Sequence, residues 1–231
     1  MRAPVLSAEV ERRLLLTWRA DPDVVTRPLP QPFRPQLVDG AAVVGVCCIR
    51  LGAVSPRGLP AAVGLRAENA AHRVAVAWDG PDGERTGVWV RQRHTGSRLV
   101  ALAGGRLFPG LHGRARFDVA ETAQRVRVGV TADGGTSPAA DVEVVPELVG
   151  SALLADLDAA SRFVETGSTG WSAAPGGRGP AGTTGCAWRP APGAWRPAAP
   201  GRCAPACTTT RASTRPAQRS STTRWSCAAC R

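Results

Sequence analysis

TGVWVRQRHTGSRLVALAGGRLFPGLHGRARF, residues 86–117, is the stretch that decides the fold prediction. It begins with the composition of a strand, Ser97 is a suitable N-cap for a short helix, and residues 112–119 alternate as a second strand does. Gly104 and Gly105 each disfavour helix by about 1 kcal/mol relative to Ala, so the helix should end near them. Two of the three histidines and several arginines lie here. The stretch therefore predicts a strand, helix and strand that carry polar chemistry.

Strand patterns extend from this unit toward the N-terminus. Residues 12–18 form a short apolar run, and residues 71–78 alternate. Between them, Asp39-Gly40 favours a two-residue hairpin turn, followed by the apolar run 41–51, which is typical of a buried strand. Asp21-Pro22 should begin a helical turn, because Asp suits an N-cap and Pro the first helical position.

Toward the C-terminus, alternation predicts a pair of strands and then a helix. Residues 125–131 should point Val126, Val128 and Val130 inward, and residues 139–145 should be their partner. The pairing would place two arginines opposite two acids: Arg125, Arg127, Asp141 and Glu143. Each such contact would add a few tenths of a kcal/mol to the stability of the sheet. A helix with a leucine stripe should begin at Ser151 and end at Gly167.

Together these elements predict an α+β fold that is mainly antiparallel β. We expect a curled double-layer sheet, barrel-like in shape, with two or three helices. Residues 1–172 should form this β domain, and residues 173–231 should be a separate, disordered tail.

Most of the net charge of +11 resides in the tail, which carries +9 of it. Residues 1–172 hold 20 Arg and 18 acidic residues, whereas residues 173–231 hold nine Arg and no acid. The tail also contains no Leu, Ile, Val, Met or Phe, so it cannot bury enough apolar surface to offset its conformational entropy. The body is therefore expected to be a near-neutral globular domain.

Three interpretations of the tail are open. Its arginines and tryptophans suit a nucleic-acid arm. Cys203, Cys207, Cys227 and Cys230 resemble a zinc site in outline. The third interpretation is a frameshift in a GC-rich gene, because reading one base later allows acidic and aliphatic residues to reappear. We favour the frameshift over zinc, since a zinc motif needs folded flanks, and over nucleic acid.

The N-terminus has charges at Glu9, Glu11, Arg12 and Arg13 and lacks a signal-peptide apolar run. No stretch approaches eighteen consecutive apolar residues. We therefore expect a soluble cytoplasmic protein with no membrane partner, no cofactor and no metal.

Several runs resemble a known family, among them LTWRADPDVVTRPLP, FRPQLVDGAAVVGVCCIRL, SRLVALAGGRLFPGLHGRARF and FVETGSTGWS. They are similar to the YqjF-like family of unknown function (domain of unknown function 2071), within the acetoacetate-decarboxylase-like superfamily. The resemblance covers about residues 10–172. It implies a double-layered antiparallel sheet curled around a central pocket.

Decarboxylases of that superfamily use a lysine in a segment resembling G-R-E-x-x-G-x-P-K. Residues 105–113 are the matching stretch, in which Arg106 and Gly110 agree, Leu107 replaces the acid and Gly113 replaces the lysine. The sequence contains no lysine at all. Because a Schiff base needs a primary amine, we expect no lysine-dependent decarboxylation.

Arg106 and His112, at the pocket corner that the resemblance implies, are the first candidate ligand-binding residues. Arg106 suits a carboxylate and His112 a hydrogen bond or a base, although Arg106 can equally pair with a structural acid while His112 lies on the sheet surface. Glu68, Asn69 and His72 form a second candidate cluster, which can instead satisfy backbone groups.

The sequence lacks a nucleophile elbow, a P-loop and a dinucleotide fingerprint. Arg91 and Arg93 are predicted to share a solvated strand face with Trp89, and Cys47 and Cys48 to pack in the core. We expect a protein that binds a small anionic or carbonyl ligand, with catalytic residues unknown. An enzyme that uses Glu68, His72 or His112 as acid or base is the alternative.

Overall fold

Thirteen strands and three helices make up the described part of the computed structural model, which comprises residues 6–56, 64–103, 110–133, 138–145, 151–166, 169–173, 183–187, 197–204 and 227–230. The helices are α1 (Pro22–Thr26), α2 (Arg98–Ala103) and α3 (Leu157–Thr166). The strands of the domain are β1 (Leu6–Ala20), β2 (Arg34–Pro35), β3 (Leu37–Val38), β4 (Ala41–Pro56), β5 (Leu65–Gly80), β6 (Gly83–Thr95), β7 (Leu111–Glu121), β8 (Arg125–Ala132), β9 (Ala139–Val144) and β10 (Thr169–Ala173). Three more strands follow, β11 (Thr183–Ala187), β12 (Pro197–Ala204) and β13 (Cys227–Cys230).

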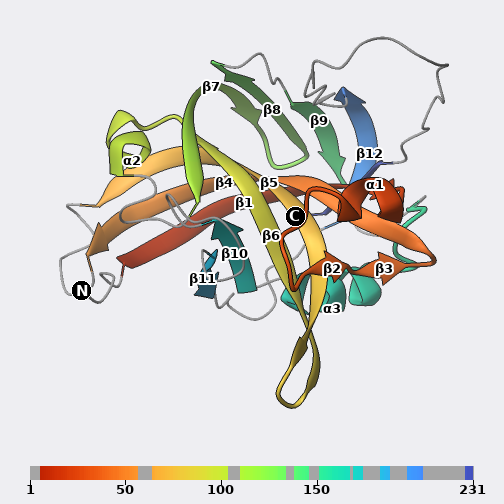
Figure 1. Ribbon diagram of the computed structural model, residues 1–231. Helices are drawn as coiled ribbons and strands as arrows, with labels where there is room; N and C mark the ends of the chain where they lie inside the picture. Colours follow the sequence, from red (N-terminus) through yellow and green to blue (C-terminus); the bar gives the residue numbers. More distant parts are fainter. Residues whose placement is uncertain are drawn as a thin grey trace, which may run out of the picture.

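The strands form one sheet that closes on itself (Figure 1). From β6 the pairing runs through β7, β8, β9, β12, β13, β1, β4 and β5, and β5 pairs with β6 again. Within the described strands, the pairs β6–β7 and β10–β6 are parallel and the others antiparallel. The segment between β6 and β7 carries α2, as a crossover between parallel strands requires. The predicted barrel-like, mainly antiparallel α+β fold is confirmed.

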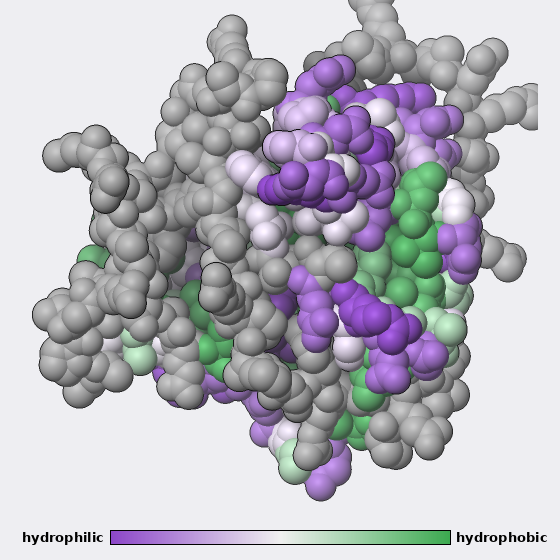
Figure 2. Space-filling view, turned by 90° about the horizontal axis from the view of Figure 1, so that it is seen from below, coloured by the Kyte–Doolittle hydropathy of each residue, from purple (hydrophilic) through white to green (hydrophobic). Residues whose placement is uncertain are grey.

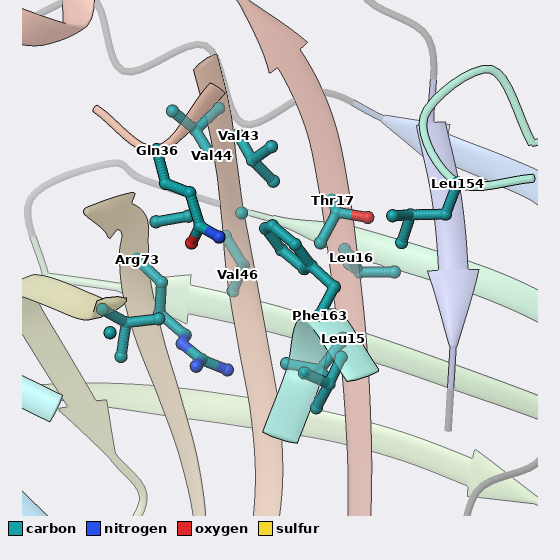
Figure 3. A pocket seen from close by; sticks show the side chains of 15 residues that line it. Leu15, Leu16, Thr17, Gln36, Val43, Val44, Val46, Arg73, Leu154 and Phe163 are labelled. Atoms are coloured by element: carbon teal, nitrogen blue, oxygen red, sulfur yellow. The ribbon is translucent and has the colours of Figure 1, made fainter. Parts of the chain in front are cut away.

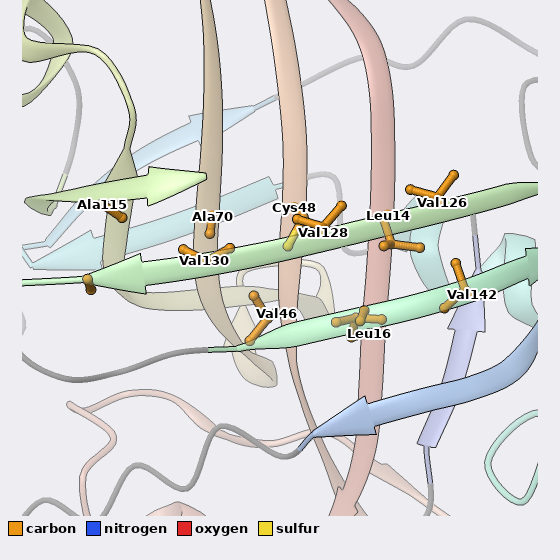
Figure 4. Close-up of a cluster of buried hydrophobic side chains, with 12 residues drawn as sticks. Leu14, Leu16, Val46, Cys48, Ala70, Ala115, Val126, Val128, Val130 and Val142 are labelled. Carbon is orange, nitrogen blue, oxygen red and sulfur yellow. The ribbon is translucent and has the colours of Figure 1, made fainter. Parts of the chain in front are cut away.

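The interior of the barrel is filled with side chains (Figure 4). Strands β8 and β9 cross over β1, β4 and β5, and the two layers meet in a cluster of buried residues: Leu14, Leu16, Val46, Cys48, Ala70, Ala115, Val126, Val128, Val130, Ala132, Ala140 and Val142. The inward orientation predicted for the three valines of β8 is confirmed. The valines alternate with exposed Arg125 and Arg127, and Arg125 makes two hydrogen bonds to Asp141 on β9.

Helix α3 covers the outer face of the same sheet. Leu153 is buried against Val43 and Ala75, and Leu154 and Phe163 pack beside them. The exposed residues of α3 are charged, and from this side the described surface combines hydrophilic and hydrophobic areas (Figure 2).

The helix predicted from Ser151 begins later, at Leu157. Ser151 instead accepts hydrogen bonds from the amides of Leu153 and Leu154, which closes a local turn. The cap is Asp156, whose Oδ1 accepts from the amide of Ala159 at 2.7 Å. The predicted start was therefore wrong, because Ser151 stabilises a turn rather than a helix terminus.

Two local predictions near the turns are settled by the structure. Asp39 and Gly40 both have positive φ (47° and 72°), as a type I′ hairpin turn requires, and β3 pairs with β4 across them. The amide of Val100 bonds to Ser97, which confirms the cap of α2. However, Leu99 and Leu102 of this helix are 61% and 77% exposed, so their side chains do not pack in the core of the described residues.

The tail contributes three short strands to the described structure. β12 pairs with β9 and β13 pairs with β1, so these strands complete the circuit of the barrel. Cys207 lies outside the described residues. Disorder elsewhere in the tail, a zinc site and a frameshift stay predictions.

Candidate functional site

A small cavity of about 50 Å³ lies between the sheet and α3 (Figure 3). Its floor comes from β1, β4, β5 and β6, and α3 forms the opposite wall. Most of the lining is aliphatic or aromatic, from residues such as Leu15, Val43, Val88 and Phe163. The cavity therefore offers an apolar surface to a small ligand.

Arg73 is the charged residue in the lining of this cavity. It lies on β5 opposite Gly45 of β4, and its side chain extends toward Phe163 and Leu15 (Figure 3). Burial lowers the pKa of the guanidinium below its usual value, while a hydrogen bond with the Cys47 thiol acts in the other direction. Gln36 and Thr17 are the other polar side chains of the lining. The cavity thus combines one cation, two neutral polar groups and an apolar body.

A β-bulge in β6 turns Arg93 toward the face of the sheet on which Arg73 lies. Val90 pairs with Arg73 and Gln92 pairs with His72, so Arg91 is an extra residue in β6. One inserted residue reverses which face the following side chains point to. Arg93, half-buried, donates from Nη1 to Ser172 Oγ at 2.5 Å. The prediction that Arg91 and Arg93 share a solvated face with Trp89 was therefore wrong for Arg93.

His112 lies beside Arg93 across the parallel pair β6–β7. Its Nδ1 donates to the carbonyl of Gly110 at 3.0 Å. Burial is the main reason that the pKa of His112 is lowered, and the charge of Arg93 adds to it. His112 is half-buried rather than on an open surface. Arg106, its predicted companion, lies outside the described residues.

Glu68 points to the opposite face of the sheet, where it belongs to an ion-pair network. Its carboxylate lies 2.5 Å from Arg12 and 2.6 Å from Arg50, and both arginines also contact Glu121. Only 3% of the Arg12 side chain is exposed, so the two acids balance a buried cation. The structure favours the structural interpretation of Glu68 over a ligand-binding one.

Asn69 and His72 are not brought together with Glu68 as one cluster. Asn69 Nδ2 donates to the carbonyl of Ala67, which is the backbone-satisfying alternative. His72 packs edge-on against His94 with ring centroids 5.4 Å apart. Burial, then the charges of His94 and Arg91, lower the pKa of His72 to about 4. The residues considered for acid–base chemistry are therefore dispersed over the sheet, since Glu68 and His112 lie on its opposite faces.

Gly113, which the sequence resemblance matches to the decarboxylase lysine, lies next to His94. A Cβ at Gly113 would lie 3.0 Å from His94 Cδ2, and Gln92 Nε2 is 3.2 Å from His94 Nε2. Both His72 Nε2 and His94 Nδ1 are buried without a hydrogen-bond partner in the described structure.

Cys47 and Cys48 are buried free thiols, as predicted. Burial raises the pKa of Cys48 to about 12. Across the described ranges, no group of three or more His, Cys, Asp or Glu side chains is arranged to hold a metal ion. Those ranges also contain no helix with the length and apolarity needed to span a membrane.

Arg73 is the site residue that sequence reasoning missed. A lone cation in the alternating run of residues 71–78 is the signal that could have identified it. Such a residue normally faces solvent. Only the position of α3 over this part of the sheet makes it a cavity residue.

Residues 7–168 match the family model of DUF2071, which is described as an uncharacterized conserved protein. The chain belongs to this family. This match confirms the family resemblance that was inferred from the sequence. No curated protein is significantly similar to it.

Solved structures similar to the DUF2071 chain include an acetoacetate decarboxylase from Legionella pneumophila, at 13% identity and a TM-score of 0.46, with 71% of this chain and 57% of that chain covered. The enduracididine biosynthesis enzyme MppR complexed with pyruvate is 17% identical, with a TM-score of 0.47 and coverage of 66% and 63%. An acetoacetate decarboxylase-like enzyme from Sphingomonas wittichii RW1 is 14% identical, with a TM-score of 0.46 and coverage of 72% and 62%. The chain thus spans less than two thirds of the length of these proteins.

Proposed function

We propose that this DUF2071 protein binds a small organic anion or carbonyl compound in the cavity under α3, and does so without Schiff-base decarboxylation. The observation that carries the proposal is Arg73, a cation in a cavity whose lining is otherwise mostly apolar. A guanidinium can donate two parallel hydrogen bonds to a carboxylate. A desolvated surrounding strengthens that interaction, because screening by water is reduced.

The neutral lining groups fit the same ligand class. Gln36 can donate to an oxygen of the ligand, while Leu15, Val43 and Phe163 suit a short hydrocarbon part. The absence of lysine from the 231 residues leaves no side-chain amine for a Schiff base. This combination supports binding rather than lysine-dependent decarboxylation.

The experiment is a thermal-shift titration with acetate, butanoate, pyruvate and acetoacetate, each compared with a neutral analogue of similar shape. We expect at least one anion to raise Tm, because a ligand at about 100 times its Kd adds about 2.7 kcal/mol of stability. Arg73→Gln should remove the shift. The matched control is Arg91→Gln, since Arg91 is an exposed arginine two positions from Arg93 on the same sheet.

Failure of every anion to stabilise the protein, or an equal shift in the Arg73→Gln variant, would overturn the proposal. The second part of the proposal is that no Schiff base forms and no decarboxylation occurs. It is tested by incubating the protein with acetoacetate and borohydride, followed by mass spectrometry. We expect no covalent adduct and no release of carbon dioxide. A reduced adduct would contradict the non-decarboxylating assignment.

A further inference from the structure

Two histidines lie together on the inner face of the barrel, on neighbouring strands. His72 of β5 pairs with Val46 of β4, and His94 of β6 pairs with Ala70 of β5. Val46 and Ala70 belong to the buried cluster between the two layers, so the histidines directly opposite them face the same interior (Figure 4). The two rings are inclined by 80°, with their centroids 5.4 Å apart.

One ring nitrogen of each histidine is buried without a hydrogen-bond partner in the described part of the chain. These atoms are Nε2 of His72 and Nδ1 of His94. Leaving a buried polar atom unpaired is costly, so a water molecule or an ion usually satisfies it. His94 is only 4% exposed, which limits its access to bulk water. One occupant bound by both rings would satisfy both nitrogens.

The spacing of the rings fits a single metal ion. A zinc ion lies about 2.0 Å from an imidazole nitrogen, and tetrahedral coordination then places the centroids of two ligating rings roughly 5 Å apart. The observed 5.4 Å is close to this distance. Burial lowers the pKa of both histidines, which keeps the rings in the neutral form that binds metal ions.

Two charged side chains act on the pair from its surroundings. Arg91 acts on His72 and opposes a cation there, whereas Asp133, which follows β8, acts on His94 and favours one. The two effects have opposite signs, so the charges of these neighbours do not exclude a metal ion.

Gln92 has the place of a residue that orients a metal ligand. It pairs with His72, and its Nε2 lies 3.2 Å from Nε2 of His94. Turning the side-chain amide over puts Oε1 in that place, where it accepts the Nε2–H of His94. Nδ1 of His94 then carries the free lone pair that a metal ligand needs. Gln92 is exposed, which gives an ion a route to the pair from solvent.

We infer that His72 and His94 bind one transition-metal ion of the class that imidazole prefers, through Nε2 and Nδ1 respectively, and that Gln92 positions His94. Imidazole suits zinc, nickel and copper, whereas magnesium and calcium take oxygen ligands. The site has two protein ligands, with water in the remaining positions. It is separate from the cavity under α3 and does not rest on the proposed function.

The test is calorimetric titration of the metal-free protein with zinc chloride at pH 7.5, compared with magnesium chloride and calcium chloride. We expect one zinc ion to bind at the histidine pair, and magnesium and calcium not to bind. Tail cysteines are a second possible source of zinc ligands, so the titration is repeated with all five changed to serine: Cys186, Cys203, Cys207, Cys227 and Cys230. Zinc binding should persist in this serine variant, and X-ray absorption of its zinc complex should show nitrogen and oxygen ligands that include imidazole.

Single substitutions identify the ligands. His72→Gln and His94→Gln should each weaken zinc binding at least about 10-fold. Gln92→Leu should weaken it by about 10-fold, and Gln92→Glu should retain it, because a carboxylate also accepts the Nε2–H of His94. His112→Gln is the matched control, since His112 lies on the other face of the sheet, and it should bind zinc as the wild type does. Unfolding midpoints without zinc show whether each variant is folded.

No zinc binding by the wild type would overturn the inference and leave water as the occupant of the pair. Loss of binding in the serine variant, or unchanged binding in both histidine variants, would assign the ion to other residues and overturn it as well. Should a histidine variant fail to fold, the X-ray absorption spectrum decides, because a zinc shell without imidazole contradicts the site. Thermal shifts with organic anions concern the proposed function alone, so the two proposals can fail separately.

Discussion

Arg12, which is buried, and Arg73, which is half-buried, show two ways in which this sheet accommodates a cation. Arg12 faces the filled interior and is neutralised by Glu68 and Glu121. Arg73 faces the cavity and lies near Arg13 and Arg93, whose charges oppose its own. The first arrangement stabilises the fold, and the second places a guanidinium in the wall of a cavity, where a small anion could bind.

Glu68→Gln should therefore lower the free energy of unfolding by about 3 kcal/mol, since it leaves Arg12 buried with one partner fewer. Asp82→Asn, which breaks the exposed pair with Arg85, is the matched control and should change stability by less than about 1 kcal/mol. Urea unfolding of the three proteins measures both effects. Equal losses in the two variants would argue against a structural role of Glu68.

His72 makes stability depend on pH. Its pKa is about 4 in the folded protein against 6.5 for an ordinary histidine, so the unfolded chain binds more protons between these values. Stability should accordingly be complete above about pH 7 and fall as the pH is lowered from 6.5 toward 4. His94, whose pKa is also lowered by burial, adds to the effect.

The free energy of unfolding, measured in urea at a series of pH values from 4 to 8, checks this prediction. His72→Gln should flatten the slope between pH 4.5 and 6.5. A wild-type slope that persists unchanged in the variant would assign the pH dependence to other groups.

At the scale of elements, α3 turns an ordinary sheet face into a cavity. Its apolar side packs against β4 and β5, and its first turn is capped by Asp156. The element is only ten residues long, so it relies on packing and capping rather than on intrinsic helix stability.

Asp156→Ala should reduce the free energy of unfolding by about 1 kcal/mol, the usual contribution of an N-cap. Asp158→Ala alters an acidic residue of the same first turn and should have a smaller effect. Circular dichroism during urea unfolding provides the measurement. A larger loss for Asp158→Ala than for Asp156→Ala would show that the cap is misassigned.

Over the whole molecule, sequence patterns predicted the layers better than the site. Val126, Val128 and Val130 could be oriented because strict alternation leaves one choice of face. Arg93 could not, since a bulge is not visible in the pattern of β6 and reverses the assignment. Arg73 was missed because its surroundings come from α3, more than eighty residues later in the chain.

The barrel depends on strands from the tail. β12 and β13 join β9 to β1, so deletion of residues 174–231 should leave both with unpaired edges. We expect the shortened protein to self-associate and to lose a cooperative unfolding transition. Analytical ultracentrifugation with thermal unfolding tests this, and a monomer with an unchanged Tm would contradict it.

The bulge at Arg91 changes which side chains of β6 point to the barrel interior. Before the bulge, Trp89 is buried against Phe33. After the bulge, His94 is the buried side chain. The extra residue reverses the alternation of β6, so Trp89 before it and Arg93 after it lie on opposite faces of the sheet. A one-residue deletion at Arg91 would restore the alternation and exchange Arg93 and His94 between the face that α3 covers and the barrel interior.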